Sequence, residues 1–135
     1  MKAWVLKNLD YVSWDRMGMF LSALCALHCL LTPLIILSIP ILARYYLAHP
    51  LFHFLLAVLI IPVGLIAFGS GIRHHGNWWV LILGLPGLCL VVGVPYFVHM
   101  LHFDWPEQIL MVIGSVLLIS AHFLNRKFCA SCAIH

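Results

Sequence analysis

Four long stretches of apolar residues, separated by short polar segments, dominate the pattern along the chain. They cover residues 17–43, 51–69, 78–97 and 108–124. Each reaches the length of about 17–25 residues that crosses a hydrocarbon core of roughly 30 Å as an α-helix. Backbone groups in lipid must be bonded internally, and these stretches lack the alternation of barrel strands, so helices are expected. We predict an all-α, polytopic membrane protein, a four-transmembrane-helix bundle forming a single domain over residues 1–135.

Composition excludes the other broad classes of protein. Apolar residues make up 64% of the 135 residues and charged residues only 8%. A soluble domain has about 25% charged residues, and a disordered chain has low hydrophobicity. The few Lys and Arg residues stand singly beside apolar runs, so no nucleic-acid partner is expected. The expected partner is the lipid bilayer.

The basic residues predict the direction of the chain. Only Arg44 lies between the first and second or the third and fourth stretches. The other six fall on the opposite side of an even-numbered bundle: Lys2, Lys7, Arg16, Arg73, Arg126 and Lys127. Cytoplasmic loops carry the excess of Lys and Arg. We therefore predict an inner (cytoplasmic) membrane protein with both termini in the cytoplasm and a cytoplasmic tail over residues 125–135.

The first stretch carries Cys25, His28 and Cys29. Residues three and four apart share one face of a helix, so these donors are expected to form one patch. Two thiols and an imidazole suit soft or borderline ions such as Hg(II), Cu(I) or Zn(II). The alternative is that the cysteines are small packing residues. A histidine near the membrane centre is costly without a role, which favours the metal site.

Further candidate ligands lie toward the cytoplasmic side. Asp15 precedes the first stretch and His122 lies four residues before Arg126. They would extend a route inward from the thiols. Asp15 is equally compatible with a helix N-cap. His122 could instead bond to a helix carbonyl, but its position within the membrane favours a functional role. Cys129 and Cys132 form a Cys-x-x-Cys pair in the tail, where reducing conditions favour metal capture over a disulfide.

Two groups of histidines complete the set of titratable candidates. His49, His53, His99 and His102 gather at the predicted extracytoplasmic ends, where metal attraction and simple interfacial placement are equally compatible with the pattern. His74 and His75 share a cytoplasmic loop with Arg73 and are expected to form a solvated turn.

Several motifs resemble the MerC family of mercuric-ion transport membrane proteins. They are Asp15-Arg16-Met17-Gly18, Cys25-Ala26-Leu27-His28-Cys29, Leu31-Thr32-Pro33 and Ala121-His122-Phe123-Leu124-Asn125-Arg126. The resemblance covers nearly the whole chain. It implies import of Hg²⁺ across the inner membrane, with Cys25 and Cys29 taking the ion and Cys129 and Cys132 receiving it inside. His28 between the thiols resembles a broader branch of the family and keeps Zn²⁺ and Cu⁺ as alternative cargo.

Two other functions remain open at this point. A Cys-x-x-Cys tail on four helices resembles membrane thiol-disulfide oxidoreductases in outline, but those need reactive cysteines on the oxidising side. A haem-binding bundle would need two histidines at matched depth. The expected function is a non-enzymatic transporter without a prosthetic group, passing its ion between thiolates and imidazoles. A cytosolic metal-receiving thiol protein and a homo-oligomer are possible partners.

Overall fold

The structure is a computed structural model that describes residues 2–39, 50–101 and 107–132. Within these ranges it consists of four helices and no strand: α1 (Lys2–Ser38), α3 (Pro50–His75), α4 (Trp79–Leu101) and α5 (Glu107–Cys132). All four are long and apolar enough to cross a membrane. The prediction of an all-α polytopic bundle is confirmed.

The helices extend beyond the predicted apolar stretches. α1 begins at Lys2 rather than near residue 17, and α5 continues to Cys132 rather than ending near residue 124. Residues 125–132 contain neither Gly nor Pro, so nothing in them stops a helix that has already formed. The predicted tail is therefore a helical continuation of α5 as far as Cys132. Residues 40–43 of the first predicted stretch and 133–135 of the tail lie outside the described residues.

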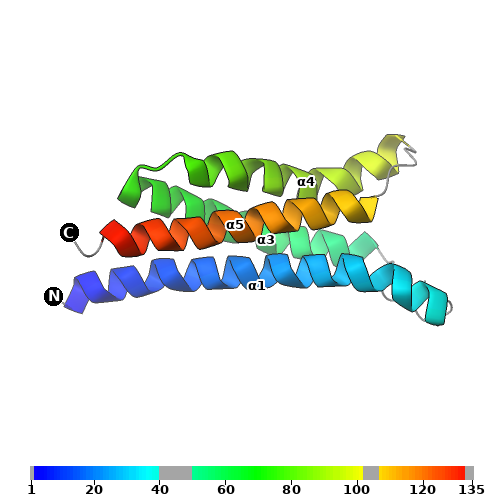
Figure 1. Ribbon diagram of the computed structural model, residues 1–135, viewed down its shortest axis with the longest axis horizontal. Coiled ribbons are helices and arrows are strands. Elements are labelled where there is room, and N and C mark those ends of the chain that lie inside the picture. The colour runs from blue at the N-terminus through cyan, green and yellow to red at the C-terminus, as the bar shows by residue number, and fades with distance from the viewer. Residues whose placement is uncertain (1, 40–49, 102–106, 133–135) are drawn as a thin grey trace.

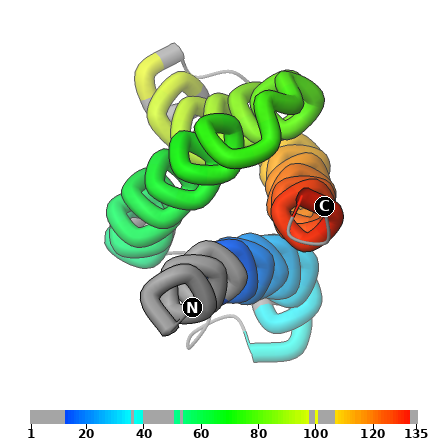
Figure 2. The backbone as a smooth tube through the Cα atoms, turned by 90° about the vertical axis from the view of Figure 1, so that its left-hand side faces the viewer, coloured from blue at the N-terminus to red at the C-terminus, as the bar shows by residue number. Residues whose placement is uncertain are grey.

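The four helices are arranged around a common axis (Figure 2). Neighbours around this ring are α1 with α3, α3 with α4, α4 with α5, and α5 with α1; α3 also contacts α5 across the centre. Both chain ends lie at the same end of the bundle (Figure 1), beside the connection between α3 and α4. We call this the basic end, because Arg16, Arg73, Arg126 and Lys127 lie there.

Small residues set two details of this arrangement. Gly76 has a φ of 63° and ends α3 where the chain turns toward α4, a conformation that glycine adopts without strain. Gly87 of α4 meets Gly114 of α5 so closely that a Cβ on Gly87 would lie 2.9 Å from the Gly114 carbonyl oxygen. Close backbone approach of this kind is a usual way of packing helices in membranes.

Candidate metal pathway between α1 and α5

One face of α1 carries small and polar residues in steps of three and four. Positions 15, 18, 22, 25, 29 and 32 hold Asp, Gly, Ser, Cys, Cys and Thr, and all six are buried. Such steps keep a stripe on the side of a helix that packs against its neighbours. α5 runs antiparallel beside α1 (Figure 1) and has a buried stripe that includes Ser115, His122, Asn125 and Cys129. We call this contact the α1–α5 seam.

The two thiols of α1 lie together in this seam. Cys25 is fully buried and Cys29 is 3% exposed. The Cys29 side chain is within hydrogen-bonding reach of Cys25, and Ser115 of α5 also reaches Cys25. Both sulfurs thus face the protein interior rather than the lipid. A linear two-coordinate ion needs two adjacent thiolates of this kind.

His28 is directed toward a different helix. Its ring is buried and stacks on Phe52 of α3, with ring centroids 4.1 Å apart and an interplanar angle of 25°. Among the described residues, no three His, Cys, Asp or Glu side chains are placed so that they could hold one ion. The structure therefore brings Cys25 and Cys29 together but does not bring His28 into a three-donor set with them. Metal binding by these residues stays a prediction.

The backbone beside the thiols is distorted by the residues that follow them. Pro33 lies inside α1 and has no N–H to donate to the carbonyl of Cys29, four residues earlier. The Thr32 hydroxyl donates a 2.7 Å hydrogen bond to the carbonyl of His28. α1 leaves its straight course in this region (Figure 1). The Leu31-Thr32-Pro33 motif thus releases a backbone oxygen at the level of Cys29.

Two buried hydroxyls flank Cys25 without satisfying their hydrogen-bonding capacity. Ser22 lies one turn before Cys25 on α1 and is 1% exposed; Ser115 of α5 is fully buried. In the described part of the protein, neither hydroxyl oxygen has a hydrogen-bond partner of good geometry. Buried polar atoms are normally bonded, and an exception points to a water or a ligand that belongs there. The surroundings of Cys25 are therefore polar enough to accept a bound species.

A second polar layer lies nearer the basic end. Asp15 and His122 are both buried, and the His122 Nδ1 donates to the Asp15 Oδ1 over 2.9 Å. The Asn125 Nδ2 lies 3.1 and 2.9 Å from the two Asp15 oxygens and 3.1 Å from the carbonyl oxygen of Ala67 on α3. These bonds join α1, α3 and α5. We call Asp15, His122 and Asn125 the interhelical clasp.

The clasp decides between the alternatives that the sequence left open for Asp15 and His122. Asp15 lies in the interior of α1, thirteen residues after its first residue, so it is not an N-cap. His122 bonds to a carboxylate rather than to a helix carbonyl. Its Nδ1–H is engaged by Asp15, which leaves the Nε2 lone pair directed at Gly18, as in carboxylate–histidine pairs that orient metal ligands.

The clasp depends on glycines that leave room for its side chains. A Cβ on Gly18 would overlap the His122 ring, and a Cβ on Gly71 of α3 would overlap the Asn125 amide. Phe68 of α3 packs on the other side of His122, with ring centroids 4.5 Å apart. The shape of the interior at this level thus fixes the two α5 side chains.

His75 extends the clasp to the connection between α3 and α4. Its Nδ1 accepts a 2.9 Å bond from the backbone N–H of Asn77, so its Nε2 carries the proton and donates to the Asn125 Oδ1 over 2.9 Å. The prediction that His75 belongs to a solvated turn is therefore wrong. His75 ends α3 but its imidazole turns back into the bundle.

The two tail cysteines occupy different environments at the basic end. Cys129 is 7% exposed and lies one turn beyond Asn125, whereas Cys132 is exposed. A cytoplasmic tail, as predicted, would expose both residues, so the burial of Cys129 differs from that prediction. Because the two residues are three apart on a helix, they share one face that leads from the interior to the surface. None of the five cysteines, all of which lie in the described part of the chain, forms a disulfide.

The outer histidine group lies outside the described part of the chain. His49 and His102 belong to undescribed segments, and the side chains of His53 and His99 are likewise not described. The prediction concerning these four residues therefore has no structural counterpart here.

Sequence reasoning missed two kinds of residue in the seam. Asn125 is three residues after His122, so the helical spacing that grouped the cysteines also places Asn125 beside that histidine. Met111 is 1% exposed, and the register that pairs Asp15 with His122 and Cys25 with Ser115 brings its thioether to the level of Cys29. A thioether is a further soft donor. Its position became recognisable only once the two helices were paired.

Comparison with known proteins identifies the family of the chain. No curated protein and no solved structure matches the chain. The family model described as MerC mercury resistance protein matches residues 15–127, well over half of the chain, including the seam from Asp15 to Asn125. The family is associated with mercury-related membrane transport, and the chain belongs to the MerC family.

Proposed function

We propose that the protein imports Hg²⁺ through the α1–α5 seam by exchanging the ion between thiolates. The adjacent buried thiols of Cys25 and Cys29, beside the buried hydroxyls of Ser22 and Ser115, are the observation that carries this proposal. They form a small polar site, separate from the interhelical clasp, among largely apolar core residues. Membrane proteins keep polar groups at such depth where a cargo passes.

The net charge of the bound state supports mercury over the alternative ions. Hg²⁺ on two thiolates is neutral, whereas Cu⁺ on the same two thiolates carries one negative charge. A charge at the membrane centre costs at least about 2.5–3.5 kcal/mol, equivalent to roughly a hundredfold weaker binding. Zn²⁺ requires four ligands, and the described residues provide no set of even three. Two-coordinate Hg²⁺ is the ion that these donors fit.

Delivery would proceed toward the basic end of the seam. At each transfer an incoming thiol loses its proton and binds the ion, while the released thiolate takes up a proton, so the ion never lies bare in lipid. Cys129 is buried at the end of the seam and Cys132 is exposed beside it. We assign Cys129 to receive the ion and Cys132 to present it to a thiol protein outside the membrane. The positive-inside bias of the sequence supports a cytoplasmic location for this end.

Uptake into vesicles tests the proposal. Proteoliposomes containing a trapped soluble dithiol would be exposed to Hg²⁺, and the accumulated mercury measured by mass spectrometry. Uptake is expected to fall at least tenfold in Cys25→Ser and Cys29→Ser. Cys89→Ser is the matched control, because Cys89 lies exposed on α4, away from the seam, and should keep wild-type uptake. Undiminished uptake in the Cys25→Ser/Cys29→Ser double variant contradicts the mechanism.

Sidedness requires a separate measurement. A C-terminal reporter that is active only in the cytoplasm should be active on this protein. Activity of an exclusively extracytoplasmic reporter would reverse the proposed direction and support the alternative of a membrane thiol-disulfide oxidoreductase.

A further inference from the structure

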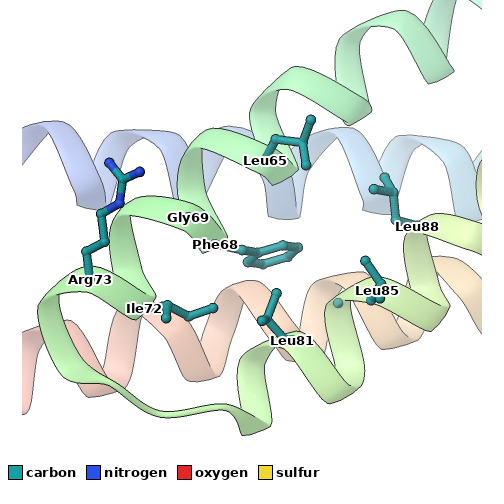
Figure 3. A pocket seen from close by; sticks show the side chains of 9 residues that line it. Leu65, Phe68, Gly69, Ile72, Arg73, Leu81, Leu85 and Leu88 are labelled. Atoms are coloured by element: carbon teal, nitrogen blue, oxygen red, sulfur yellow. The ribbon is translucent and has the colours of Figure 1, made fainter.

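A groove opens between α3 and α4 on the side of the bundle away from α1. It has a volume of about 270 Å³ and lies near the basic end (Figure 3). Phe68 forms part of its wall, and Arg73 lies at one end. The rest of the wall is mainly aliphatic, and Figure 3 shows these side chains around the opening: Leu65, Ile72, Leu81, Leu85 and Leu88. The groove is thus an apolar slot with a single cationic side chain.

The depth of the groove corresponds to one membrane leaflet. Leu65 lies eight residues before Arg73 on α3, which is about 12 Å along the helix axis. A hydrocarbon core is roughly 30 Å thick, so a slot of this length stays within one half of it. Trp78 and Trp79 are exposed beside the Arg73 end, where tryptophans mark the boundary between lipid and water. Arg73 therefore lies at headgroup level and the leucines at acyl-chain level.

Arg73 has no ion-pair partner among the residues whose side chains the structure describes. Its guanidinium is directed away from the leucines in Figure 3 while its stem lines the groove, the usual placement of an arginine at a membrane surface. Basic residues at the cytoplasmic ends of helices recognise anionic headgroups.

We propose that this groove binds one acyl chain of an anionic phospholipid whose phosphate is held by Arg73. An amphiphile with a negatively charged head matches both the apolar slot and the cation at its end. The apolar side chains of both helices line the slot and Arg73 lies at one end, an arrangement that suits a single acyl chain with an anionic head.

Gly69 keeps the slot open and provides the decisive variant. A Cβ on Gly69 would meet no heavy atom within 4 Å, so a larger side chain extends into the groove without disturbing the helix packing. Gly69→Leu therefore fills the slot, whereas Arg73→Gln removes the charge and leaves the slot open. Arg16→Gln is the matched control, since Arg16 is another exposed arginine at the basic end but on α1, which does not contact α4 among the described residues.

The experiment measures lipid retention by the purified full chain. Delipidated protein in detergent would be titrated with phosphatidylglycerol or phosphatidylcholine, and bound lipid counted by native mass spectrometry. Wild type and Arg16→Gln should prefer phosphatidylglycerol, Arg73→Gln should lose about fivefold of that affinity, and Gly69→Leu should lose retained lipid of both kinds. The proposal is overturned if Gly69→Leu and Arg73→Gln both keep the wild-type preference for phosphatidylglycerol. It is also overturned if Arg16→Gln loses as much affinity for phosphatidylglycerol as Arg73→Gln.

Two further measurements exclude other occupants. Soluble glycerol phosphate should not raise the melting temperature of the protein at concentrations where phosphatidylglycerol does; an equal rise would mean a phosphate site without a lipid chain and overturns the proposal. Gly69→Leu should leave the oligomeric state unchanged in size-exclusion chromatography with light scattering. A shift of oligomeric state without loss of lipid would assign the groove to a second copy and also overturns it.

Discussion

Two glycines of α3, two residues apart, offer a direct test of the interhelical clasp. Gly71→Ala places a methyl group where the Asn125 amide lies, whereas Gly69→Ala places it in open space. The two variants make the same chemical change in the same helix. Any difference between their stabilities therefore reports on what the new methyl group meets.

The expected difference follows from the bonds of Asn125. Displacing its amide weakens one charge-assisted contact to Asp15, at about 1.5–3 kcal/mol, and two neutral bonds to Ala67 and His75, at about 0.5–1.5 kcal/mol each. Alanine returns about 0.5–1 kcal/mol by favouring the helix. Gly71→Ala should therefore lose about 2–5 kcal/mol of unfolding free energy, and Gly69→Ala should lose none.

Unfolding of the purified variants by increasing denaturing detergent, followed by far-UV circular dichroism, measures these free energies. A double-mutant cycle completes the test: in an Asn125→Ala background, Gly71→Ala should cost less than about 1 kcal/mol, because the group it displaces is gone. Equal stability of Gly69→Ala and Gly71→Ala in the wild-type background would refute the packing described here. So would an undiminished cost of Gly71→Ala after removal of the Asn125 amide.

Three further predictions concern other parts of the bundle. Asp15→Ala removes the carboxylate that accepts hydrogen bonds from His122 and Asn125. It should lower the unfolding free energy by about 2–5 kcal/mol in the same assay. A loss under ~1 kcal/mol would argue against the clasp. Gly84→Ala places a Cβ 2.6 Å from the Phe68 ring and should lower the unfolding free energy by about 1–3 kcal/mol. Most of this loss should disappear in a Phe68→Leu background. An unchanged loss in that background would contradict the contact. Cys132→Ser should slow release of bound Hg²⁺ to a soluble dithiol in stopped-flow measurements without reducing capture, and normal release would remove Cys132 from the exit.

The sequence predicted the number and type of the helices because hydropathy alone decides which segments cross a membrane. It did not predict where α1 and α5 end. Asp15 and Arg126 look like boundaries when charge is taken to mark the membrane surface, yet both lie inside continuous helices. Helix ends are set by capping and backbone bonding, and a polar residue interrupts hydropathy without interrupting a helix.

The site was predicted as far as single-helix geometry reaches. Cys25 and Cys29 are neighbours because of their spacing on one helix, and the structure places them together. The direction of His28 depends on which helix lies beside α1, and Phe52 of α3 receives it. The role of His75 depends on a contact between residues 50 positions apart. Pairings of this kind are not encoded in the spacing along one helix.

Hydrogen bonding separates the buried polar residues of the seam into two groups. Asp15 accepts bonds from His122 and Asn125, and these bonds account for its burial without any cargo. Ser22 and Ser115 lie about two turns away at the level of Cys25, and their buried hydroxyls have no partner of good geometry in the described structure. Bonds among Asp15, His122 and Asn125 hold the helices together, whereas the Ser115 hydroxyl faces the Cys25 thiol across the seam. The buried hydroxyls beside the thiols therefore support the level of Cys25 as the ion site of the proposed transport, and the clasp holds α1 and α5 together near it.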